Sequence, residues 1–317
     1  MKRIIAGLVL TGILVCFVGC AGSQNTTWAA IHKPRIFGAT YMTKNNPFFD
    51  ILDEGIEEVV QANGDVLLTR NPLQDQQKQN DQILEMIDAG MELLFLNPVD
   101  WEGVTPALEA CKQAGVGIIN VDTVVKDTDY VISIIETDHY QAGQICALDM
   151  MKRTSKAKIF VLNNPIQQSI CSRIEGFKDA IVENENYQIV YETNGGGEIE
   201  VSAKETESLL QKNIEFNVIL GGNDPSALGA LASLQKFRKD DNILIYGIDG
   251  SPDFKGMLEV GYVTGTSSQN PRQLGKTAAE TAYAYLNGKT VEKHILLPSE
   301  LITRENLVDY SIHTWQQ

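Results

Sequence analysis

The sequence is poor in basic residues. Among its 317 residues, 26 are lysine or arginine and 41 are aspartate or glutamate, so the formal net charge is −15. A nucleic-acid-binding protein draws on an excess of positive charge to neutralise phosphates. This balance therefore excludes DNA and RNA as expected partners. Acidity by itself also keeps a protein soluble, so it names no partner.

The motifs of several common enzyme classes are missing as well. There is no HExxH, no GxSxG, no P-loop, and no GxGxxG after a predicted strand. Three glycines at 195–197 follow a predicted strand, but they lack the Lys-Ser/Thr pair that cradles a phosphate. We therefore expect no enzyme. The enzymatic alternative that stays open is a pair of aspartates acting as general acid and base.

Cysteine is scarce. Of five cysteines, Cys16 and Cys20 lie in the first twenty residues. The other three, Cys111, Cys146 and Cys171, show no CxxC spacing and have no nearby histidine. We expect no metal site and no cofactor. Cys111 and Cys146 fall on predicted helices and Cys171 lies just before one, which favours buried thiols, and one disulfide stays open as an alternative.

The one long apolar run is at the N-terminus, where residues 4–18 follow Lys2 and Arg3. The run is too short and too rich in glycine at its end for a membrane span, so it predicts a secretion signal. It ends in Gly19-Cys20, which resembles a bacterial lipobox. That resemblance implies cleavage after residue 19 and a lipid on Cys20, which would hold the exported protein on the outer face of a membrane.

Two alternatives to a lipid on Cys20 stay open at this N-terminus. Cys16 is a poorer candidate for the lipid, because Val15 before it is branched. A plain signal peptide with a chance cysteine is the other alternative. Residues 20–33 are polar and unpatterned for most of their length, which is typical of a flexible tether.

From residue 35 onward, short apolar runs alternate with amphipathic segments. Strands are predicted at 35–42, 65–69, 92–96, 117–121, 131–135, 158–162, 188–191, 218–220, 243–248 and 263–267. Helices are predicted at 47–61, 73–89, 101–113, 140–152, 174–182, 201–211, 225–237, 253–260 and 274–286. This alternation predicts an α/β protein with parallel sheets. Two doubly wound halves fit best, since one sheet of about ten strands is uncommon.

Polar side chains crowd the carboxyl ends of the predicted strands, where open parallel sheets bind their ligands. These ends carry residues 45–49 (NNPFF), 97–100 (NPVD), 122–123 (DT), 163–164 (NN), 221–224 (GGND), 249–250 (DG) and 269–271 (QNP). Helix capping explains Asp100 and Asp224. It explains less well the two phenylalanines, Phe48 and Phe49, beside amides at the first strand end.

In their order, these segments resemble the ribose- and galactose-type periplasmic binding proteins, the receptors of ABC sugar importers, whose fold is shared by LacI-type repressors. The specific matches are residues 45–49, 97–98, 223–230 (NDPSALGA) and 247–253 (GIDGSPD). The resemblance runs from about residue 35 to residue 301. It implies the type 1 fold, in which two lobes joined by a three-strand hinge close on a ligand and exclude water.

The resemblance also implies where the lobes divide. The crossings lie near 136–138, near 268–270, and after about 297. Residues 34–137 plus 269–297 form the N-terminal lobe, and 138–268 plus 298–317 form the C-terminal lobe. We expect a monomer.

The residues at the matched positions suit a sugar or polyol. Phe48 and Phe49 can offer apolar faces to the C–H side of a sugar ring, although core packing at a helix start is the alternative for either. Asp122 and Asp249 can each accept hydrogen bonds from two neighbouring hydroxyls. The predicted site contains further polar residues: Asn46, Asn223 and Gln269, which both donate and accept, and Arg173, which neutralises an aspartate in a closed cleft.

Two departures from the ribose binders leave the sugar open. Those proteins carry an arginine directly after the aspartate matched by Asp122, whereas this sequence has Thr123, which we keep in the predicted site. They also place an aromatic residue near positions 194–198, which read NGGGE here. A second stacking face is therefore either absent or supplied by Tyr191 or Trp101. Another pentose, a hexose, an inositol or another polyol is equally open.

The expected function is capture of a sugar or polyol and its delivery to the permease of an ABC importer. The alternative is a sugar sensor that signals through a membrane histidine kinase or chemoreceptor, since the binding chemistry would be the same. A repressor is excluded, because the chain begins with an export signal instead of a basic helix-turn-helix.

Overall fold

The computed structural model describes residues 33–239 and 242–315, and residues 34–317 form one compact unit. The predicted signal, Cys16, Cys20 and nearly all of the predicted tether lie outside the described residues. Within the described part of the chain, no helix has the length and apolar character needed to cross a membrane.

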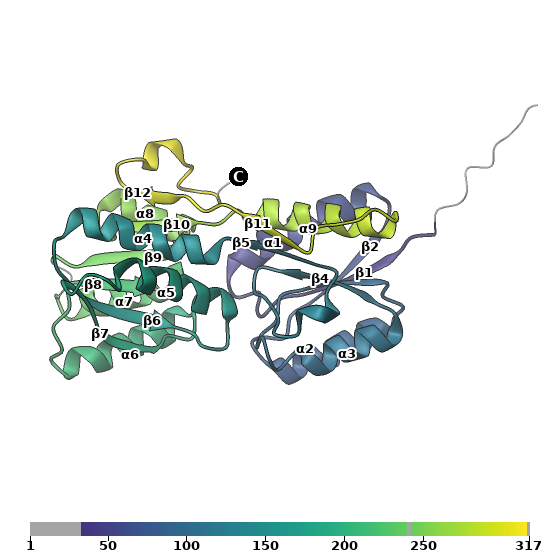
Figure 1. Cartoon of the computed structure of the whole chain (residues 1–317), viewed down its shortest axis with the longest axis horizontal. Coiled ribbons are helices and arrows are strands. Elements are labelled where there is room, and N and C mark those ends of the chain that lie inside the picture. The colour runs from purple at the N-terminus through teal and green to yellow at the C-terminus, as the bar shows by residue number, and fades with distance from the viewer. Residues whose placement is uncertain (1–32, 240–241, 316–317) are drawn as a thin grey trace, which may run out of the picture. The chain divides into compact units, whose positions relative to one another are not determined.

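Strands and helices alternate along the chain and build two six-stranded sheets (Figure 1). The first has the order β11 (His294–Leu297), β5 (Ser133–Thr137), β4 (Gly117–Val121), β3 (Leu93–Leu96), β1 (Ile36–Thr40), β2 (Val66–Arg70). The second has the order β12 (Leu301–Thr303), β10 (Gly265–Ser268), β9 (Leu244–Asp249), β8 (Val218–Gly221), β6 (Ala157–Asn163), β7 (Tyr187–Asn194). Neighbouring strands are parallel, except that β12 runs antiparallel to β10.

Helices cover both faces of each sheet. On the first sheet, α1 (Pro47–Ala62) and α9 (Pro271–Leu286) pack on one face, and α2 (Gln76–Asp88) and α3 (Thr105–Ala114) on the other. On the second, α4 (His139–Arg153) and α5 (Gln168–Ile181) face α6 (Ile199–Gln211), α7 (Asp224–Lys236) and α8 (Pro252–Val260) across the sheet. The sequence of β3, Leu-Leu-Phe-Leu, is fully buried because both of its faces are covered.

The chain passes between the two sheets three times, after β5, after β10 and after β11. All strands of the first sheet fall within residues 34–137 and 269–297, and all strands of the second within 138–268 and 298–317. The predicted α/β fold with two doubly wound lobes is confirmed.

The structure corrects several predicted elements. The edge strands β11 and β12 were not predicted; β11 is half-exposed and β12 has three residues, so neither gives a buried apolar run. The helix predicted from residue 73 begins at Gln76, because Leu73 and Gln74 have positive φ and Asp75 caps the helix. The helix predicted from residue 101 begins at Thr105, since residues 100–104 form separate turns.

Two glycines bring α4 and α5 into close contact. A Cβ added at Gly143 would lie 1.7 Å from the carbonyl oxygen of Arg173, and one at Gly176 would lie 2.0 Å from that of Tyr140. Only glycine allows the two backbones to approach this closely. The contact fixes the part of α5 that carries Arg173 against α4.

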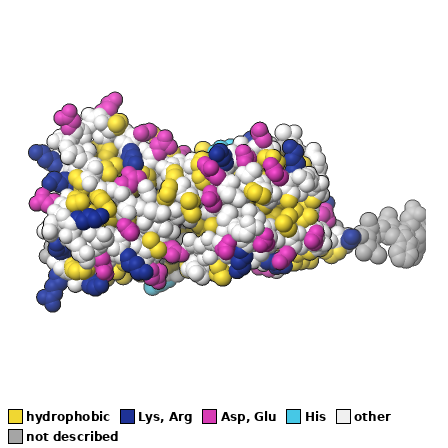
Figure 2. Space-filling model, turned by 90° about the horizontal axis from the view of Figure 1, so that it is seen from below, with side chains coloured by type: hydrophobic (Ala, Val, Ile, Leu, Met, Phe, Trp, Pro, Cys, Tyr) yellow, Lys and Arg dark blue, Asp and Glu magenta, His cyan; other side chains and the backbone are white. Residues whose placement is uncertain are grey.

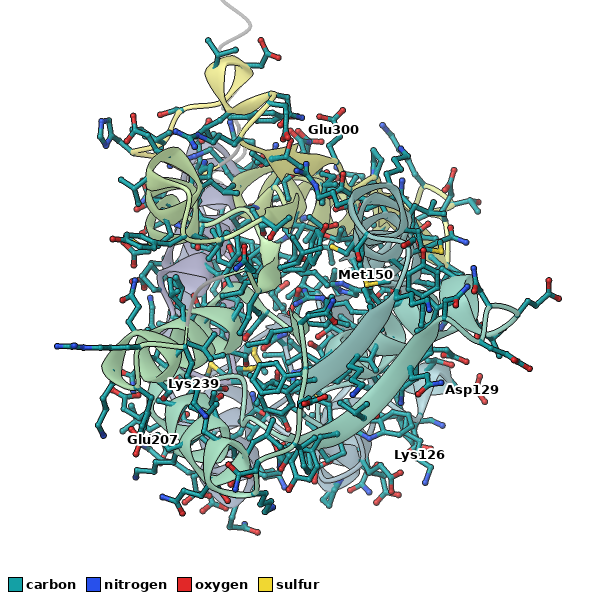
Figure 3. All side chains as sticks on the ribbon, turned by 90° about the vertical axis from the view of Figure 1, so that its left-hand side faces the viewer. Lys126, Asp129, Met150, Glu207, Lys239 and Glu300 are labelled. Carbon is teal, nitrogen blue, oxygen red and sulfur yellow. The ribbon has the colours of Figure 1, made fainter. Side chains whose placement is uncertain are left out.

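Burial elsewhere follows residue type. Met150 of α4 is fully buried, Glu207 is half-buried and Lys239 is exposed; Figure 3 labels all three. Figure 2 shows acidic and basic side chains interspersed over one face. Cys111 and Cys146 are buried free thiols, as predicted, and burial raises the pKa of each to about 12. Cys171 is also free but only half-buried, which corrects that part of the prediction.

Candidate functional site

A cavity of about 690 Å³ is lined by side chains from both lobes. Eight of the predicted site residues line it: Asn46, Phe48, Phe49, Asp122, Arg173, Asn223, Asp249 and Gln269. They meet because each lies at or near the carboxyl end of a strand or in the first turns of the following helix. The structure thus brings these residues together, and their role in binding stays a prediction.

Thr123 is placed differently. Its side chain is fully buried and does not line the cavity. Its hydroxyl lies 3.2 Å from Oδ2 of Asp122 and 2.9 Å from the hydroxyl of Ser169 on α5. Thr123 therefore donates a hydrogen bond to the Asp122 carboxylate and also contacts the second lobe through Ser169.

Asp122 presents an unused acceptor. Its Oδ2 accepts hydrogen bonds from Nδ2 of Asn97 at 3.0 Å and from the hydroxyl of Thr123 at 3.2 Å. Its Oδ1 is buried, with no hydrogen-bond partner in the described part of the chain. Burial raises the pKa of this carboxyl to about 6, although Arg173 lowers it. Asp122 also has a φ of 64°, a strained backbone conformation of the kind found at functional sites.

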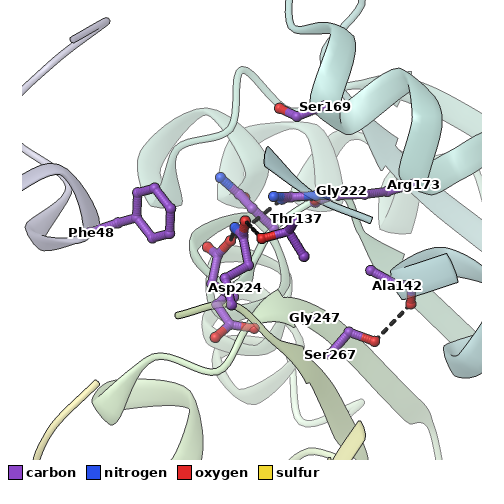
Figure 4. A network of polar contacts seen from close by, with 12 residues as sticks. Phe48, Thr137, Ala142, Ser169, Arg173, Gly222, Asp224, Gly247 and Ser267 are labelled. Atoms are coloured by element: carbon purple, nitrogen blue, oxygen red, sulfur yellow. Dashed lines mark hydrogen bonds and ion pairs between the residues drawn. The ribbon is translucent and has the colours of Figure 1, made fainter. Parts of the chain in front are cut away.

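On the side of the cavity formed by the second lobe, Arg173 links two strand ends through hydrogen bonds. Its Nη1 donates to the carbonyl oxygen of Gly222 at 2.9 Å and to Oδ1 of Asp249 at 3.4 Å. The same Oδ1 accepts from Nε2 of Gln269 at 2.7 Å. The side chains of Arg173 and Asp249 are 4% and 5% exposed, so this is a buried ion pair. Burial raises the pKa of Asp249, and Arg173 opposes that shift. Figure 4 shows Arg173 beside Gly222, with the ring of Phe48 across from it.

A histidine that sequence reasoning missed links the two walls. Nε2 of His139 lies 2.9 Å from the carbonyl oxygen of Asp122, and Nδ1 lies 3.2 Å from Nε of Arg173. Since Nε of Arg173 can only donate, Nδ1 accepts and Nε2 carries the proton. Burial, together with the charge of Arg173, holds the pKa of His139 well below its usual range, so the ring is neutral. A single histidine at a helix start gives no signal in the sequence.

The helix caps at the cavity are not the residue that the sequence predicted, Asp224. Oδ1 of Asn46 accepts from the backbone N–H of Phe48, and Oδ1 of Asn223 accepts from that of Ser226, so both asparagines cap helices. Asp224, which was predicted to be a cap, is not one. Its carboxylate instead accepts from the hydroxyl of Thr266 and the N–H of Ser251, and so joins strand ends of the second lobe.

The hinge carries a further buried carboxyl, Glu136. Oε1 of Glu136 lies 2.6 Å from Nε2 of His294 on the neighbouring strand. Burial and the charge of Asp122 raise the pKa of Glu136 to about 8. Beside it, the hydroxyl of Thr137 donates to Oε1 of Gln269 at 2.8 Å, which orients the Gln269 amide toward Asp249.

Phe48 and Phe49 have the core-packing role that was one of the two predictions, and their stacking on a sugar ring stays a prediction. Phe48 and Phe49 line the cavity and also belong to the buried core of the first lobe, with ring centroids 5.2 Å apart. Tyr191 packs against Phe160 instead, and neither Tyr191 nor Trp101 lines the cavity. The further aromatic lining residue is Trp315, which sequence reasoning missed.

Polar contacts join the two walls directly. Besides the Thr123–Ser169 contact, Nε2 of Gln167 donates to the sulfur of Met42 at 2.8 Å. Gln74 donates to the carboxylate of Glu198 across the cavity rim. These residues lie in loops and at the start of α5, and among them only Thr123 was a predicted site residue. They show that the two lobes are in contact in this structure.

The family model for the periplasmic binding protein domain matches residues 37–290. The chain belongs to the periplasmic binding protein family. This confirms the resemblance to the ribose- and galactose-type proteins. The family consists of binding proteins, so this member is not an enzyme, and membership implies an exported protein.

Individual members of the family are similar over nearly the whole chain. The ribose import binding protein of Bacillus subtilis is 27% identical, covering 96% of this chain and all of its own length. A solute-binding protein of Mycobacterium smegmatis solved with bound glycerol is 25% identical, with a TM-score of 0.82 over 90% of this chain and 100% of its own. One from Bacillus halodurans solved with myo-inositol has a TM-score of 0.81 at 22% identity, over 87% of this chain and 96% of its own, and shows the same type 1 fold.

Proposed function

We propose that this protein binds a sugar or another cyclic polyol in the cavity between its lobes and delivers it to the permease of an ABC importer. The observation that carries the proposal is Asp122, a residue that lines the cavity and whose buried Oδ1 has no hydrogen-bond partner within the described chain. A hydroxyl group is a donor of the size and chemistry to fill that position.

The rest of the cavity suits the same ligand. Asp249 offers a second carboxylate, fixed by Arg173 and Gln269. Asn46 uses Oδ1 for capping, so its Nδ2 is left to donate to a ligand oxygen. The phenyl ring of Phe48 supplies an apolar surface for the C–H face of a ring. Carboxylates, amides and an aromatic face together are complementary to a polyol.

The comparisons support this ligand class. The similar Bacillus subtilis protein is named for ribose import, and the two similar structures hold glycerol and myo-inositol. In this chain, Thr123 lies behind Asp122 and does not reach the cavity. Because the ribose binders carry an arginine at this position, we expect this protein to rank the polyols in a different order from them.

The test is a thermal-shift screen of the chain from Ser23 onward, which contains the whole compact unit of residues 34–317. The panel is D-ribose, D-galactose, L-arabinose, myo-inositol, glycerol and uridine. A ligand that binds only the folded state stabilises it by about 2.7 kcal/mol at a hundred times its dissociation constant. We expect a concentration-dependent rise in melting temperature with one or a few of the sugars or with myo-inositol. A rise with uridine alone, or none with any polyol, would contradict the proposal.

We further propose that Cys20 carries a lipid that anchors the protein to a membrane. The change Cys20→Ser is expected to move the full-length protein into the soluble or secreted fraction and to remove the lipid mass from the N-terminal peptide. Cys16→Ser is the matched control, and it should leave both the membrane fraction and the lipid mass unchanged. Membrane association of the Cys20→Ser protein without lipid would show that anchoring has another cause.

A further inference from the structure

The C-terminal tail, residues 307–315, begins on the second lobe. After β12 it forms the short 3-10 helix η2 (Leu307–Asp309) and continues without regular structure. Leu307 belongs to the same apolar cluster as Phe254 and Leu258 of α8, and Tyr310 and Ile312 pack against that cluster. In Figure 1 the tail lies beside β12 and α8 and then turns toward the region between the two sheets.

A buried lysine fixes the end of this tail. Nζ of Lys255 on α8 donates to the carbonyl oxygen of Thr314 at 2.7 Å. Lys255 is fully buried, and that burial lowers the pKa of its amine. Buried charges are rare unless they are paired or hydrogen-bonded. Chain ends are ordinarily loose unless something ties them down. The Lys255–Thr314 bond is such a tie.

The next residue reaches the first lobe. The Trp315 ring lies with its centroid 5.6 Å from that of Phe48, at an interplanar angle of 73°. Trp315 is 8% exposed and belongs to the core cluster of the first lobe that contains Phe48 and Phe49. It also lines the cavity, to which Phe48 and Phe49 both contribute from α1. Trp315 is therefore the aromatic lining residue that comes from a different segment.

We propose that Trp315 is a ligand-binding residue, and that the tail is a strap laying this indole over the cavity as a second apolar wall. The inference rests on the proposed sugar-binding function. Because the Phe48 and Trp315 rings meet edge to face, they form a corner of two apolar surfaces. Such a corner fits a ring that carries C–H groups on adjacent sides, such as myo-inositol or a pyranose. A short linear polyol such as glycerol covers less of it.

The strap also connects ligand binding to lobe closure. Its base packs on α8 of the second lobe, and its tip packs on Phe48 of the first lobe. Separating the lobes requires breaking either the Lys255–Thr314 bond or the Trp315–Phe48 contact. The strap therefore stabilises the closed form and slows release of a bound sugar.

The test measures binding of myo-inositol, D-ribose and glycerol by isothermal titration to four forms of the chain from Ser23: wild type, Trp315→Ala, Trp315→Phe and Tyr262→Ala. Losing the burial of one aromatic side chain is expected to weaken binding of the cyclic probes by about tenfold to a hundredfold in Trp315→Ala. Trp315→Phe should retain most of the affinity. Tyr262 is half-exposed and does not line the cavity, so Tyr262→Ala should match the wild type.

A second measurement is independent of whether Trp315→Ala folds. In a Trp28→Phe, Trp101→Phe double variant, Trp315 is the remaining tryptophan of the chain. Its fluorescence should change when the bound probe, myo-inositol or D-ribose, is added. An unchanged fluorescence spectrum with a probe that binds, or wild-type affinity in Trp315→Ala, would overturn this inference and leave the proposed function standing. If the wild type binds none of the three probes, the proposed function fails and the inference fails with it.

Discussion

Arg173→Met is expected to lower the free energy of unfolding by about 3–5 kcal/mol and to abolish measurable binding of any polyol found in the screen. Methionine fills much of the volume of the arginine side chain but leaves the carboxylate of Asp249 without its buried counter-charge. The carbonyl oxygen of Gly222 and Nδ1 of His139 lose their donors at the same time. Urea denaturation measures the stability change, and isothermal titration measures the binding.

Arg153→Met is the matched control. Arg153 makes a two-pronged ion pair with Glu305 at 2.9 Å, but its side chain is 29% exposed. Exposed pairs contribute about 1 kcal/mol or less, so this variant should bind polyols as the wild type does. Equal losses in the free energy of unfolding in the two variants would show that the buried Arg173–Asp249 pair stabilises the fold no more than an exposed ion pair does.

Asp122→Asn is expected to stabilise the empty protein while it weakens ligand binding. Burial raises the pKa of Asp122 from 3.8 to about 6. Between these pH values the folded state holds a proton that the unfolded chain has released, so stability falls as the pH rises from about 4 to about 6. Above pH 6 the penalty amounts to about 3 kcal/mol, from a shift of roughly two pKa units at 1.36 kcal/mol each. Asparagine does not ionise, so the variant should unfold at a higher urea concentration at pH 7.5 and lose the advantage at pH 4.

The effect on binding has the opposite sign. A hydrogen bond to a charged group contributes about 1.5–3 kcal/mol, so Asp122→Asn should weaken binding of the best polyol about tenfold to a hundredfold. Because bound hydroxyls favour the ionised carboxylate, wild-type affinity should fall as the pH drops below about 6. The affinity of the variant should depend less on pH between 5 and 7 than that of the wild type, and the dependence that remains comes from Asp249, whose pKa burial also raises. His139 is neutral there, and Glu136 titrates higher, near 8.

The control for this pH profile is Asp179→Asn. Asp179 accepts a hydrogen bond from the hydroxyl of Tyr140 in an exposed position on α5. The pH dependence of binding in this variant should match that of the wild type. An Asp122→Asn protein that keeps the wild-type affinity and its pH dependence would remove Asp122 from the site.

Much of this site could be predicted because parallel strands end at a common edge. Asn223 and Asp249 are far apart in the sequence, yet one follows and the other ends a strand of the second sheet, so the strand pattern places them at one edge. Asp122 follows β4 of the first sheet, and the two-lobed fold implied by the resemblance brings the two edges to face each other. The polar strand ends also carried the resemblance to the family. The strand pattern therefore predicts which loops lie at the cavity, but it does not predict how each side chain in them is oriented. Thr123 follows Asp122, yet it does not line the cavity, and its hydroxyl contacts Asp122 and Ser169 instead.

The residues that sequence reasoning missed depend on contacts with no local pattern. His139 owes its role to two partners, the Asp122 carbonyl and Arg173, that lie on other elements. Trp315 lies beyond the last strand, and nothing in the sequence between β12 and the chain end indicates a return to α1. The edge strands β11 and β12 were missed for a similar reason, because their pairing with a neighbouring strand defines them and they have no long apolar run.

The position of Trp315 also determines where this protein can be labelled. A purification tag or fluorescent domain fused after residue 317 would be separated by only two residues from a side chain buried in the cavity wall. Such a fusion would compete with the anchoring of Thr314 by Lys255 and would lower the measured affinity for reasons unrelated to the ligand. An internal label at Val308, which is 90% exposed, leaves the tail end free. Because Val308 lies at the base of the same tail, a dye attached there would report on its movement.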